Sequence, residues 1–345
     1  EIYMGDWSSD VCSSDLLRHL LYGPAWGWYF AGGVAAGLGV VTKGVGFLPL
    51  LVLLPYAVLR NRGFGPLPRV GGGVRWALAP LGLVIGVLAW LVPMLLAAAR
   101  RPDLAAYRDE ILFHQTVDRY TNPWHHTRPW YYFVVEVIPM LWLPVSLLLF
   151  WLVPRWRDAW RERDARVWLP LSWALLVLLF FSLSAGKRGV YILPALPAVV
   201  LAAASYLEAL SARRGVQRAS LALAALLLAV VGLAVGRVEL TSIVPFAVFL
   251  VAGAILWAIA WRKRPILAWP ALLALLAVVW GVSIAPAINA SRSGRAFIGH
   301  ALARVGPHET LGLVGYREQF LLYLGRPTVK DRKSTRLNSS HPYRS

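Results

Sequence analysis

Residues Val177 to Pro197 read VLLFFSLSAGKRGVYILPALP, and this stretch is the most specific indicator of the fold in the chain. Two apolar segments are joined by a short polar turn, Ala185 to Gly189, so the chain leaves one hydrophobic helix and enters the next almost at once. The apolar segments extend outward to Val167 and Leu210. Each is close to the roughly 20 residues that a helix needs to cross the hydrocarbon core of a bilayer. The pattern predicts a hairpin of two transmembrane helices.

The composition of the whole chain agrees with a membrane protein. Hydrophobic residues make up 58% of the 345 residues, and 17 residues are tryptophan, whereas soluble globular chains have about 45–50% apolar residues. We therefore expect an all-α polytopic membrane protein with about nine transmembrane spans. The first two spans are short, so they are either half-helices or a re-entrant hairpin. The expected spans are Trp26–Val41, Val45–Leu59, Trp76–Ala99, Trp130–Val153, Val167–Ala185, Val190–Leu210, Leu221–Gly236, Ile243–Trp261 and Ile266–Ala285.

The basic residues indicate the topology. The formal net charge is +18, but the cations are spread through short loops without a continuous basic stripe, so we expect no nucleic-acid partner. Four loops are dense in arginine and lysine, and the positive-inside rule places them in the cytoplasm. They are residues 60–75, 154–166, 211–218 and 262–264. Strict alternation then places residues 42–44, 100–129, 186–189, 237–242 and everything after Ala285 on the outer side.

The turn between Ala185 and Gly189 carries two cations on the predicted outer face. Lys187 and Arg188 have no acidic neighbour in the sequence, and such cations run against the usual charge bias of outer loops. An anion is the natural partner for them, and phosphate fits best. Tyr191 follows one turn later and could donate a hydrogen bond to the same group. A basic turn whose side chains snorkel to the interface is the alternative.

The outer loop at residues 100–129 contains the most polar and aromatic segment, HQTVDRYTNPWHHTRPWYY, from His114 to Tyr132. Its rings fit an aromatic belt at the membrane surface. Two cations in this segment, Arg119 and Arg128, could also bind a lipid phosphate. His125 and His126 could bind a divalent metal if a further ligand comes from elsewhere, although adjacent histidines are a weak metal signal.

Two isolated charges lie inside or beside apolar segments. Lys43 separates the first two short spans, where it either snorkels to the interface or holds an ammonium near the outer headgroups to meet a lipid phosphate. Glu136 lies about two turns inside the span that begins at Trp130. A carboxylate there is either functional, if it faces the helix bundle, or paired with Arg128 or a neighbouring arginine.

Both ends of the chain match translated sequencing adapter. Asp6 to Leu16 reads DWSSDVCSSDL, one frame of a common adapter, and Asp331 to His341 reads DRKSTRLNSSH, one frame of its reverse complement. We therefore assign residues 1–16 and 331–345 to adapter and exclude them from the fold. Cys12, the only cysteine in the chain, falls in the first of these segments. Disulfides and cysteine metal sites are then excluded from the native part.

The native part divides into a membrane region and a polar tail. Residues 17–285 form the membrane region, and residues 286–330 read as the start of an outer α/β domain that the adapter truncates. Within this tail, Ser293–Val305 is expected to be a helix, Thr310–Gly315 a buried strand, and Glu318–Leu324 a second helix.

Three motifs together resemble glycosyltransferase family 39, and in particular bacterial members similar to lipid A aminoarabinose transferases and protein O-mannosyltransferases. They are Thr42-Lys43-Gly44, the segment from Arg119-Tyr120 to Tyr132, and SAGKRGVYILP at Ser184–Pro194. The resemblance covers residues Leu17 to Val329, and GYREQ at Gly315–Gln319 adds to it. It implies a GT-C fold, a polyprenyl-phosphate-linked sugar donor, a lipid or protein acceptor, and transfer at the periplasmic face of a bacterial inner membrane.

The resemblance also implies how the site would work. The donor phosphate would be held by cations with tyrosines donating beside them, and these donors would stabilise the negative charge that grows on the leaving group. The residues are Lys43, Arg119, Arg128, Lys187, Arg188, Tyr131, Tyr132 and Tyr191. In the family the general base is an acidic residue in the first outer loop, and the sequence has no such loop, so we expect this fragment to be inactive. We assign no cofactor with certainty; a divalent metal is one that the histidines could hold.

Two other functions are compatible with a polytopic membrane protein. A transporter or lipid flippase would show internal repeats and charges near the middle of its spans. The sequence shows no clear repeat, and its polar residues gather on one side. An O-antigen ligase or polymerase would share the lipid donor and the outer arginines, but has no evident need for the polar tail.

Overall fold

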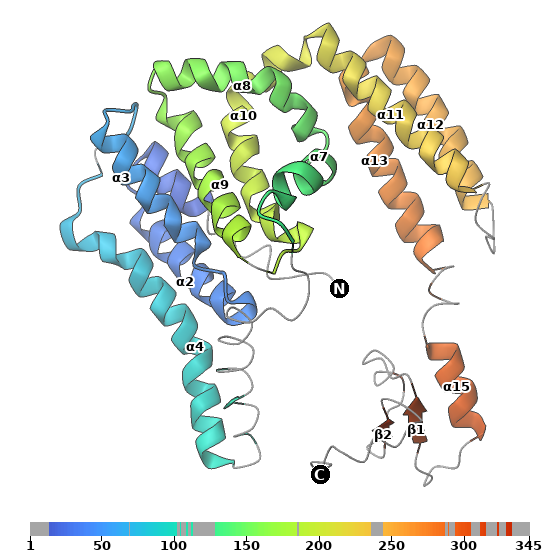
Figure 1. The fold of residues 1–345 in the computed structure, drawn as a ribbon, viewed down its shortest axis with the longest axis horizontal. Helices are drawn as coiled ribbons and strands as arrows, with labels where there is room; N and C mark the ends of the chain where they lie inside the picture. Colours follow the sequence, from blue (N-terminus) through green and yellow to red (C-terminus); the bar gives the residue numbers. More distant parts are fainter. Residues whose placement is uncertain are drawn as a thin grey trace. The chain divides into compact units, whose positions relative to one another are not determined.

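The computed structural model describes residues 14–101 apart from residue 69, 128–235 apart from residue 185, 244–286, 294–304, 311–314 and 329–332, with isolated positions at 104, 108, 109, 112, 289 and 323. The chain divides into two compact units, Glu1–Val216 and Gln217–Ser345. Each unit is described by itself (Figure 1).

The first half of unit 1 is mostly helical. A helix at residues 14–22 precedes a series of α-helices and 3₁₀ helices. These are α2 (Trp26–Lys43), η1 (Leu48–Val52), α3 (Leu53–Asn61), η2 (Gly73–Ala77) and α4 (Leu78–Arg100). The leading helix crosses the adapter boundary at residue 16, where Leu16 is fully buried; the boundary stays a prediction.

The second half of unit 1 contains the hairpin predicted at Val177 to Pro197. Its elements are the π-helix η5 (Phe133–Val137), α7 (Ile138–Leu141), α8 (Val145–Arg161), α9 (Ala165–Leu183), the 3₁₀ helix η6 (Gly189–Ala195) and α10 (Leu196–Ser211). α9 and α10 lie side by side (Figure 1). The hairpin prediction is confirmed.

Unit 2 consists of a helical layer and a small mixed segment. The helices are α11 (Arg214–Val235), α12 (Val244–Lys263), η7 (Pro265–Leu267), α13 (Ala268–Val279) and the π-helix η8 (Trp280–Ile284). After them come α15 (Arg295–Arg304) and two parallel strands, β1 (Leu311–Val314) and β2 (Val329–Arg332). The helix expected near Ser293 and the strand expected near Thr310 are thus present. The second expected helix, Glu318–Leu324, lies almost entirely outside the described residues.

The membrane prediction is confirmed in its coarser form. Within the described residues, six helices are long and apolar enough to cross a membrane, or seven if one bent pair is counted as a single span. This is a multi-pass membrane protein. The two short N-terminal helices, α2 and the η1–α3 pair at Leu48–Asn61, are not among the six, so the count of nine spans stays a prediction.

The span expected at Trp130–Val153 is not one straight helix. Phe133–Leu141 and Val145–Arg161 meet at an angle of 111°. Two prolines explain the break, because Pro139 and Pro144 lack the N–H that continues a helix, and Pro144 occupies the position just before α8. We therefore correct the predicted straight span to a bent pair.

Glycines allow α2 and α4 to pack backbone to backbone. Gly33 and Gly37 on α2 face Gly82 and Gly86 on α4, four residues apart on each helix. A Cβ added to Gly33 or Gly37 would lie 2.2 Å from the carbonyl oxygen of Ala79 or Leu83, respectively. No side chain fits at these positions, so the contact requires glycine. Small residues play this role between transmembrane helices in general, because they let the backbones approach closely.

α9 is the central helix of unit 1. Its buried face includes Trp173, which is 1% exposed and donates from Nε1 to the carbonyl of Leu48 at 2.8 Å. At its first turn, Gly65 and Asp164 form a parallel bridge. The 19 residues of α9 span about 28 Å at 1.5 Å per residue. The loop at Gly65 and the turn at Lys187 are therefore about one hydrocarbon thickness apart, as the predicted topology requires.

Candidate lipid-phosphate site

The turn after α9 contains a buried lysine. α9 ends at Leu183, and Ser184 follows in an extended conformation. Lys187 is 5% exposed. Its Nζ donates to the carbonyl oxygen of Ser184 and, at 3.0 Å, to that of Arg128. The sequence predicts an unpaired, outward-facing ammonium; the structure turns it inward, because two backbone carbonyls accept its hydrogen bonds.

The contact with Lys187 fixes the start of the bent span. The side chain of Arg128 is exposed, and its guanidinium carbon lies 5.6 Å from the centre of the Tyr132 ring, a cation–π arrangement. The backbone N–H of Tyr132 donates to the carbonyl of Pro129 at 3.1 Å. The segment from Arg128 to Tyr132 therefore presents a guanidinium and a phenol side by side. The hydrogen bond from Lys187 to the Arg128 carbonyl holds this segment in place.

Two further aromatic side chains follow Arg128 at the surface. Trp130 is 72% exposed and Tyr131 45% exposed, and their ring centres are 5.7 Å apart with the planes nearly perpendicular. Exposed rings at the predicted end of a span fit the aromatic belt that the sequence offered as one interpretation.

A row of aromatic rings connects the lysine turn to the end of α2. Tyr191 lies 5.3 Å from Phe181, measured between ring centres. Phe181 lies 5.1 Å from Phe180, and Phe180 lies 5.8 Å from Phe47. Phe47 comes four residues after Lys43, the last residue of α2. The structure thus brings the Thr42-Lys43-Gly44 turn to the same end of α9 as Lys187.

Gly44 ends α2 in a left-handed conformation, with φ of 76° and its N–H donating to the carbonyl of Val40. This cap is typical of glycine, which adopts positive φ without steric cost. It explains why the motif reads Thr-Lys-Gly. The side chain of Lys43 lies outside the described part, so its predicted contact with a phosphate stays a prediction.

The predicted residues fall into two groups. The structure joins two segments through the hydrogen bond from Lys187 to the Arg128 carbonyl: residues 128–132, which include Arg128, Tyr131 and Tyr132, and residues 184–191, which include Lys187, Arg188 and Tyr191. Arg188 is exposed and its carbonyl accepts from the N–H of Tyr191 at 3.0 Å. Arg119, His125 and His126 lie outside the described residues. Where the chain is described, no group of three histidine, cysteine or acidic side chains could hold a metal ion.

Glu136 is exposed, in the π-helix η5. The sequence left open whether it serves a function or pairs with Arg128. No ion pair joins these two described residues, so pairing with Arg128 is not observed. π-helices are rare and often occur at functional sites.

Chemically, this turn can bind an anion. Of the three N–H groups of the Lys187 ammonium, two donate to carbonyls, which leave its positive charge in place. No carboxylate in the described residues forms an ion pair with Lys187, and the exposed guanidiniums of Arg128 and Arg188 add positive charge. Guanidinium groups bind phosphate oxygens in a bidentate manner. The turn therefore has the charge and the donors for a phosphate monoester or diester at a membrane surface.

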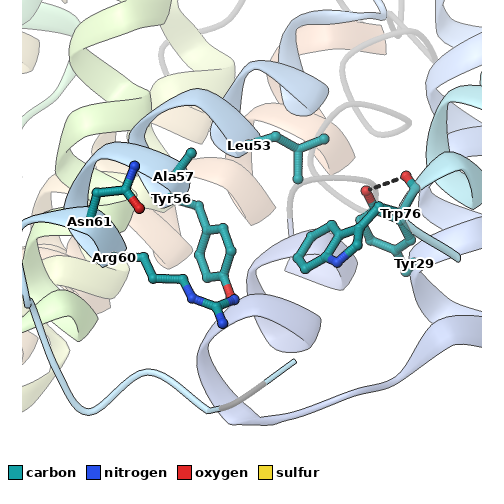
Figure 2. A pocket seen from close by; sticks show the side chains of 7 residues that line it. All are labelled: Tyr29, Leu53, Tyr56, Ala57, Arg60, Asn61 and Trp76. Carbon is teal, nitrogen blue, oxygen red and sulfur yellow. Dashed lines mark hydrogen bonds between the residues drawn. The ribbon is translucent and has the colours of Figure 1, made fainter. Parts of the chain in front are cut away.

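Sequence reasoning missed a cavity at the opposite end of α2. It has a volume of about 310 Å³ and is lined by Tyr29, Leu53, Tyr56, Ala57, Arg60, Asn61 and Trp76 (Figure 2). The hydroxyl of Tyr29 donates to the carbonyl of Trp76 at 3.1 Å, and Arg60 donates to the hydroxyl of Tyr56 at 3.1 Å. The cavity lies at the predicted cytoplasmic end, away from the lysine turn. No motif in the sequence signals it, since its walls come from three separate elements.

A buried histidine beside this cavity was also missed. His19 is fully buried, and its ring centre lies within 4.5, 4.6 and 5.7 Å of those of Trp26, Tyr29 and Trp76. The N–H of Ala25 donates to its Nδ1 at 2.9 Å, while Nε2 has no partner within the described residues. Removal from water lowers the pKa of His19 below its usual value, because burial disfavours the imidazolium.

Comparison with known proteins identifies the relatives of this chain. No family model matches it. Curated sequences do: an undecaprenyl phosphate-alpha-4-amino-4-deoxy-L-arabinose arabinosyl transferase of Pseudomonas aeruginosa is 34% identical over 269 residues, 71% of this chain and 44% of the relative. The enzyme of the same name from Serratia proteamaculans is 33% identical over 192 residues, 53% of this chain and 31% of the relative. The chain is a relative of the aminoarabinose transferases. The resemblance seen in its motifs is confirmed.

The fold has solved counterparts. Crystal structures of ArnT from Cupriavidus metallidurans match with TM-scores of 0.61 for the form bound to undecaprenyl phosphate and 0.63 for the apo form. The first shares 23% identity and covers 88% of this chain and 56% of ArnT; the second shares 21% and covers 95% and 61%. This likeness shows the fold. The chain spans less than half the length of the curated relatives above, so the activity of the whole protein is a matter for proposal.

Proposed function

We propose that this chain is part of a membrane glycosyltransferase that moves a sugar from a polyprenyl-phosphate-linked donor to a lipid acceptor. The observation that carries the proposal is the cationic turn at the predicted outer end of α9, where Lys187 holds the Arg128 backbone in place. The relatives, named as undecaprenyl phosphate aminoarabinose transferases, support undecaprenyl phosphate as the donor's carrier and 4-amino-4-deoxy-arabinose as the sugar. A lipid A-like acceptor agrees with the same resemblance.

In this proposal the donor phosphate lies against the turn. Arg128 and Arg188 contact its oxygens, and Tyr131, Tyr132 and Tyr191 donate beside them. The buried Lys187 adds its positive charge to the site and keeps Arg128 in position through the hydrogen bond to its carbonyl. Lys43 and Arg119 belong to the same site. As the glycosidic bond to phosphate breaks, negative charge grows on the departing phosphate, and preorganised donors stabilise that charge more than they stabilise the bound donor.

The topology forms part of the proposal. The nine spans, the periplasmic side of the site, the GT-C arrangement and an outer α/β domain that begins after Ala285 all follow from the pattern of basic loops and from the resemblance. The helix α15 and the parallel strands β1 and β2 support the domain. The last two residues of β2, Asp331 and Arg332, belong to the segment assigned to adapter, so the native partner strand would differ there.

A photoactivatable analogue of undecaprenyl phosphate-aminoarabinose tests this function on the chain itself. The expected result is labelling of peptides that contain residues 128–132 or 184–191, with competition by undecaprenyl phosphate but not by undecaprenol, which lacks the phosphate. Labelling spread over all spans, or equal competition by undecaprenol, would overturn the proposal, because the lipid tail alone would then account for binding.

A further inference from the structure

A second basic and aromatic cavity lies at the other end of α9. It has a volume of about 370 Å³ and is lined by Arg157, Trp160, Arg161 and Trp168. Three of these residues are in the last two turns of α8, and Trp168 is in the first turn of α9. The length of α9 separates this cavity from the lysine turn, so it is distinct from the candidate donor site.

The indole walls of this cavity are held in place. Trp160 and Trp168 contact edge to face, with ring centres 4.6 Å apart. The Nε1 of Trp168 donates to the carbonyl of Trp156 at 3.0 Å, and the ring centres of Phe64 and Trp160 are 5.0 Å apart. The nearby Nε1 of Trp156 donates to the carbonyl of Ala202 on α10 at 3.1 Å. The walls of the cavity therefore come from α8 and α9, and contacts with α10 and with Phe64 hold their tryptophans in place.

The two arginines that line the cavity are less well paired with carboxylates than Arg166 nearby. Arg166 is bound by Asp164, with contacts of 3.1 and 2.9 Å. Arg157 forms no ion pair within the described residues, and Arg161 has only a long contact with Asp158, 3.4 Å between two exposed side chains. Arg157 and Arg161 are four residues apart on one helix face, where like charges repel each other. An anion between them would relieve that repulsion.

An apolar stripe leads along α8 to these arginines. Phe150 and Val153 precede Arg157 at spacings that keep all three on one face of the helix, and they are 78% and 39% exposed. Figure 1 shows α8 crossing over the ends of α9 and α10. The stripe and the arginines together match an amphiphile with acyl chains and an anionic head. A free phosphate ion would use the arginines but not the stripe.

We propose that Arg157, Arg161, Trp160 and Trp168 bind the headgroup of an anionic phospholipid in the cytoplasmic leaflet, with its acyl chains along Phe150 and Val153. The guanidiniums contact the phosphate oxygens, as arginines do in bidentate phosphate binding. The indoles lie at headgroup depth, where tryptophan is enriched in membrane proteins. Basic pockets between helices on the cytoplasmic side bind anionic headgroups in other membrane proteins.

Lipid titration of the purified, delipidated chain tests this site, with binding followed by native mass spectrometry. Phosphatidylglycerol is compared with zwitterionic phosphatidylcholine and with inorganic phosphate. The variant Arg157→Gln/Arg161→Gln is expected to weaken phosphatidylglycerol binding roughly tenfold or more, as the loss of charge-assisted hydrogen bonds predicts. The matched control Arg213→Gln/Arg218→Gln removes two exposed cations, one just before α11 and one in its second turn, on the same predicted face, and is expected to leave binding within about twofold.

Three outcomes would overturn the proposal. Equal weakening by both double variants would indicate attraction by total charge. No weakening by the first variant would exclude the cavity, provided that circular dichroism shows it folded. Displacement of the lipid by millimolar inorganic phosphate would indicate a free-anion site. The variant Arg157→Lys/Arg161→Lys adds a further check: it keeps the charge but loses the planar fork, and is expected to bind phosphatidylglycerol with intermediate affinity.

Discussion

The Nζ of Lys187 donates a hydrogen bond to the backbone carbonyl of Arg128, 59 residues earlier in the chain, at 3.0 Å. This bond joins the turn after α9 to the start of the bent span. It makes Lys187 a positioning residue for Arg128 as well as a source of charge. A lysine that only snorkelled to the interface would not be 5% exposed with two carbonyl partners.

The first prediction concerns this bond. Lys187→Met keeps most of the volume but leaves the carbonyls of Ser184 and Arg128 without their donor, so we expect a loss of about 1–3 kcal/mol in stability. Amide hydrogen exchange at Tyr132 should rise, because the Pro129 turn is released. Arg213→Met serves as control, since it removes a cation from an exposed loop. Unchanged exchange at Tyr132 would show that the lysine does not hold this segment.

The second prediction tests the glycine contact between α2 and α4. Gly37→Ala would place a Cβ 2.2 Å from the Leu83 carbonyl oxygen, so the helices must separate, at a cost of about 1–3 kcal/mol for overpacking. Gly27→Ala, on the same helix with no atom within 4 Å of the added Cβ, is the matched control and should be neutral or slightly stabilising. Thermal unfolding in detergent measures both. Equal melting temperatures for the two variants would refute the close contact.

The third prediction is a pH dependence caused by His19. Because burial lowers its pKa in the folded chain, the unfolded chain binds the proton more readily. Stability is therefore highest above the unfolded pKa of 6.5 and falls as the pH drops below that value toward the folded pKa. The melting temperature of the wild-type chain should decrease from pH 7.5 to pH 5.

The control for this pH effect is His19→Phe, which keeps an aromatic ring among Trp26, Tyr29 and Trp76 but cannot be protonated. Its melting temperature should change less over the same range. If wild type and variant lost the same number of degrees between pH 7.5 and pH 5, the effect would have to come from another group.

Sequence reasoning succeeded where one segment carries the whole signal. The hydrophobic runs and the five-residue turn at Ala185 to Gly189 were enough for the hairpin of α9 and α10, since each helix hides its own backbone polar groups. The motifs at Lys43 and Lys187 were enough for the relationship to aminoarabinose transferases. Strand β1 and helix α15 also followed from local periodicity.

It failed where the outcome depends on a distant partner. The inward position of Lys187 depends on a carbonyl 59 residues away, which no local pattern contains. The burial of His19 depends on Trp76, a residue of another helix. The bend in the predicted span was detectable, since Pro139 and Pro144 lie inside the apolar run. A span predicted from hydrophobicity alone does not take into account that a proline interrupts a helix.

The central claim is that the turn around Lys187 and Arg128 binds the phosphate of a polyprenyl phosphate. Its most direct test is the affinity of the purified chain for undecaprenyl phosphate compared with undecaprenol, measured for wild type, Arg128→Gln/Arg188→Gln and the control Arg213→Gln/Arg218→Gln. We predict that wild type and the control favour the phosphorylated lipid by roughly tenfold or more and that Arg128→Gln/Arg188→Gln loses this preference. Equal preference in all three proteins would contradict the account.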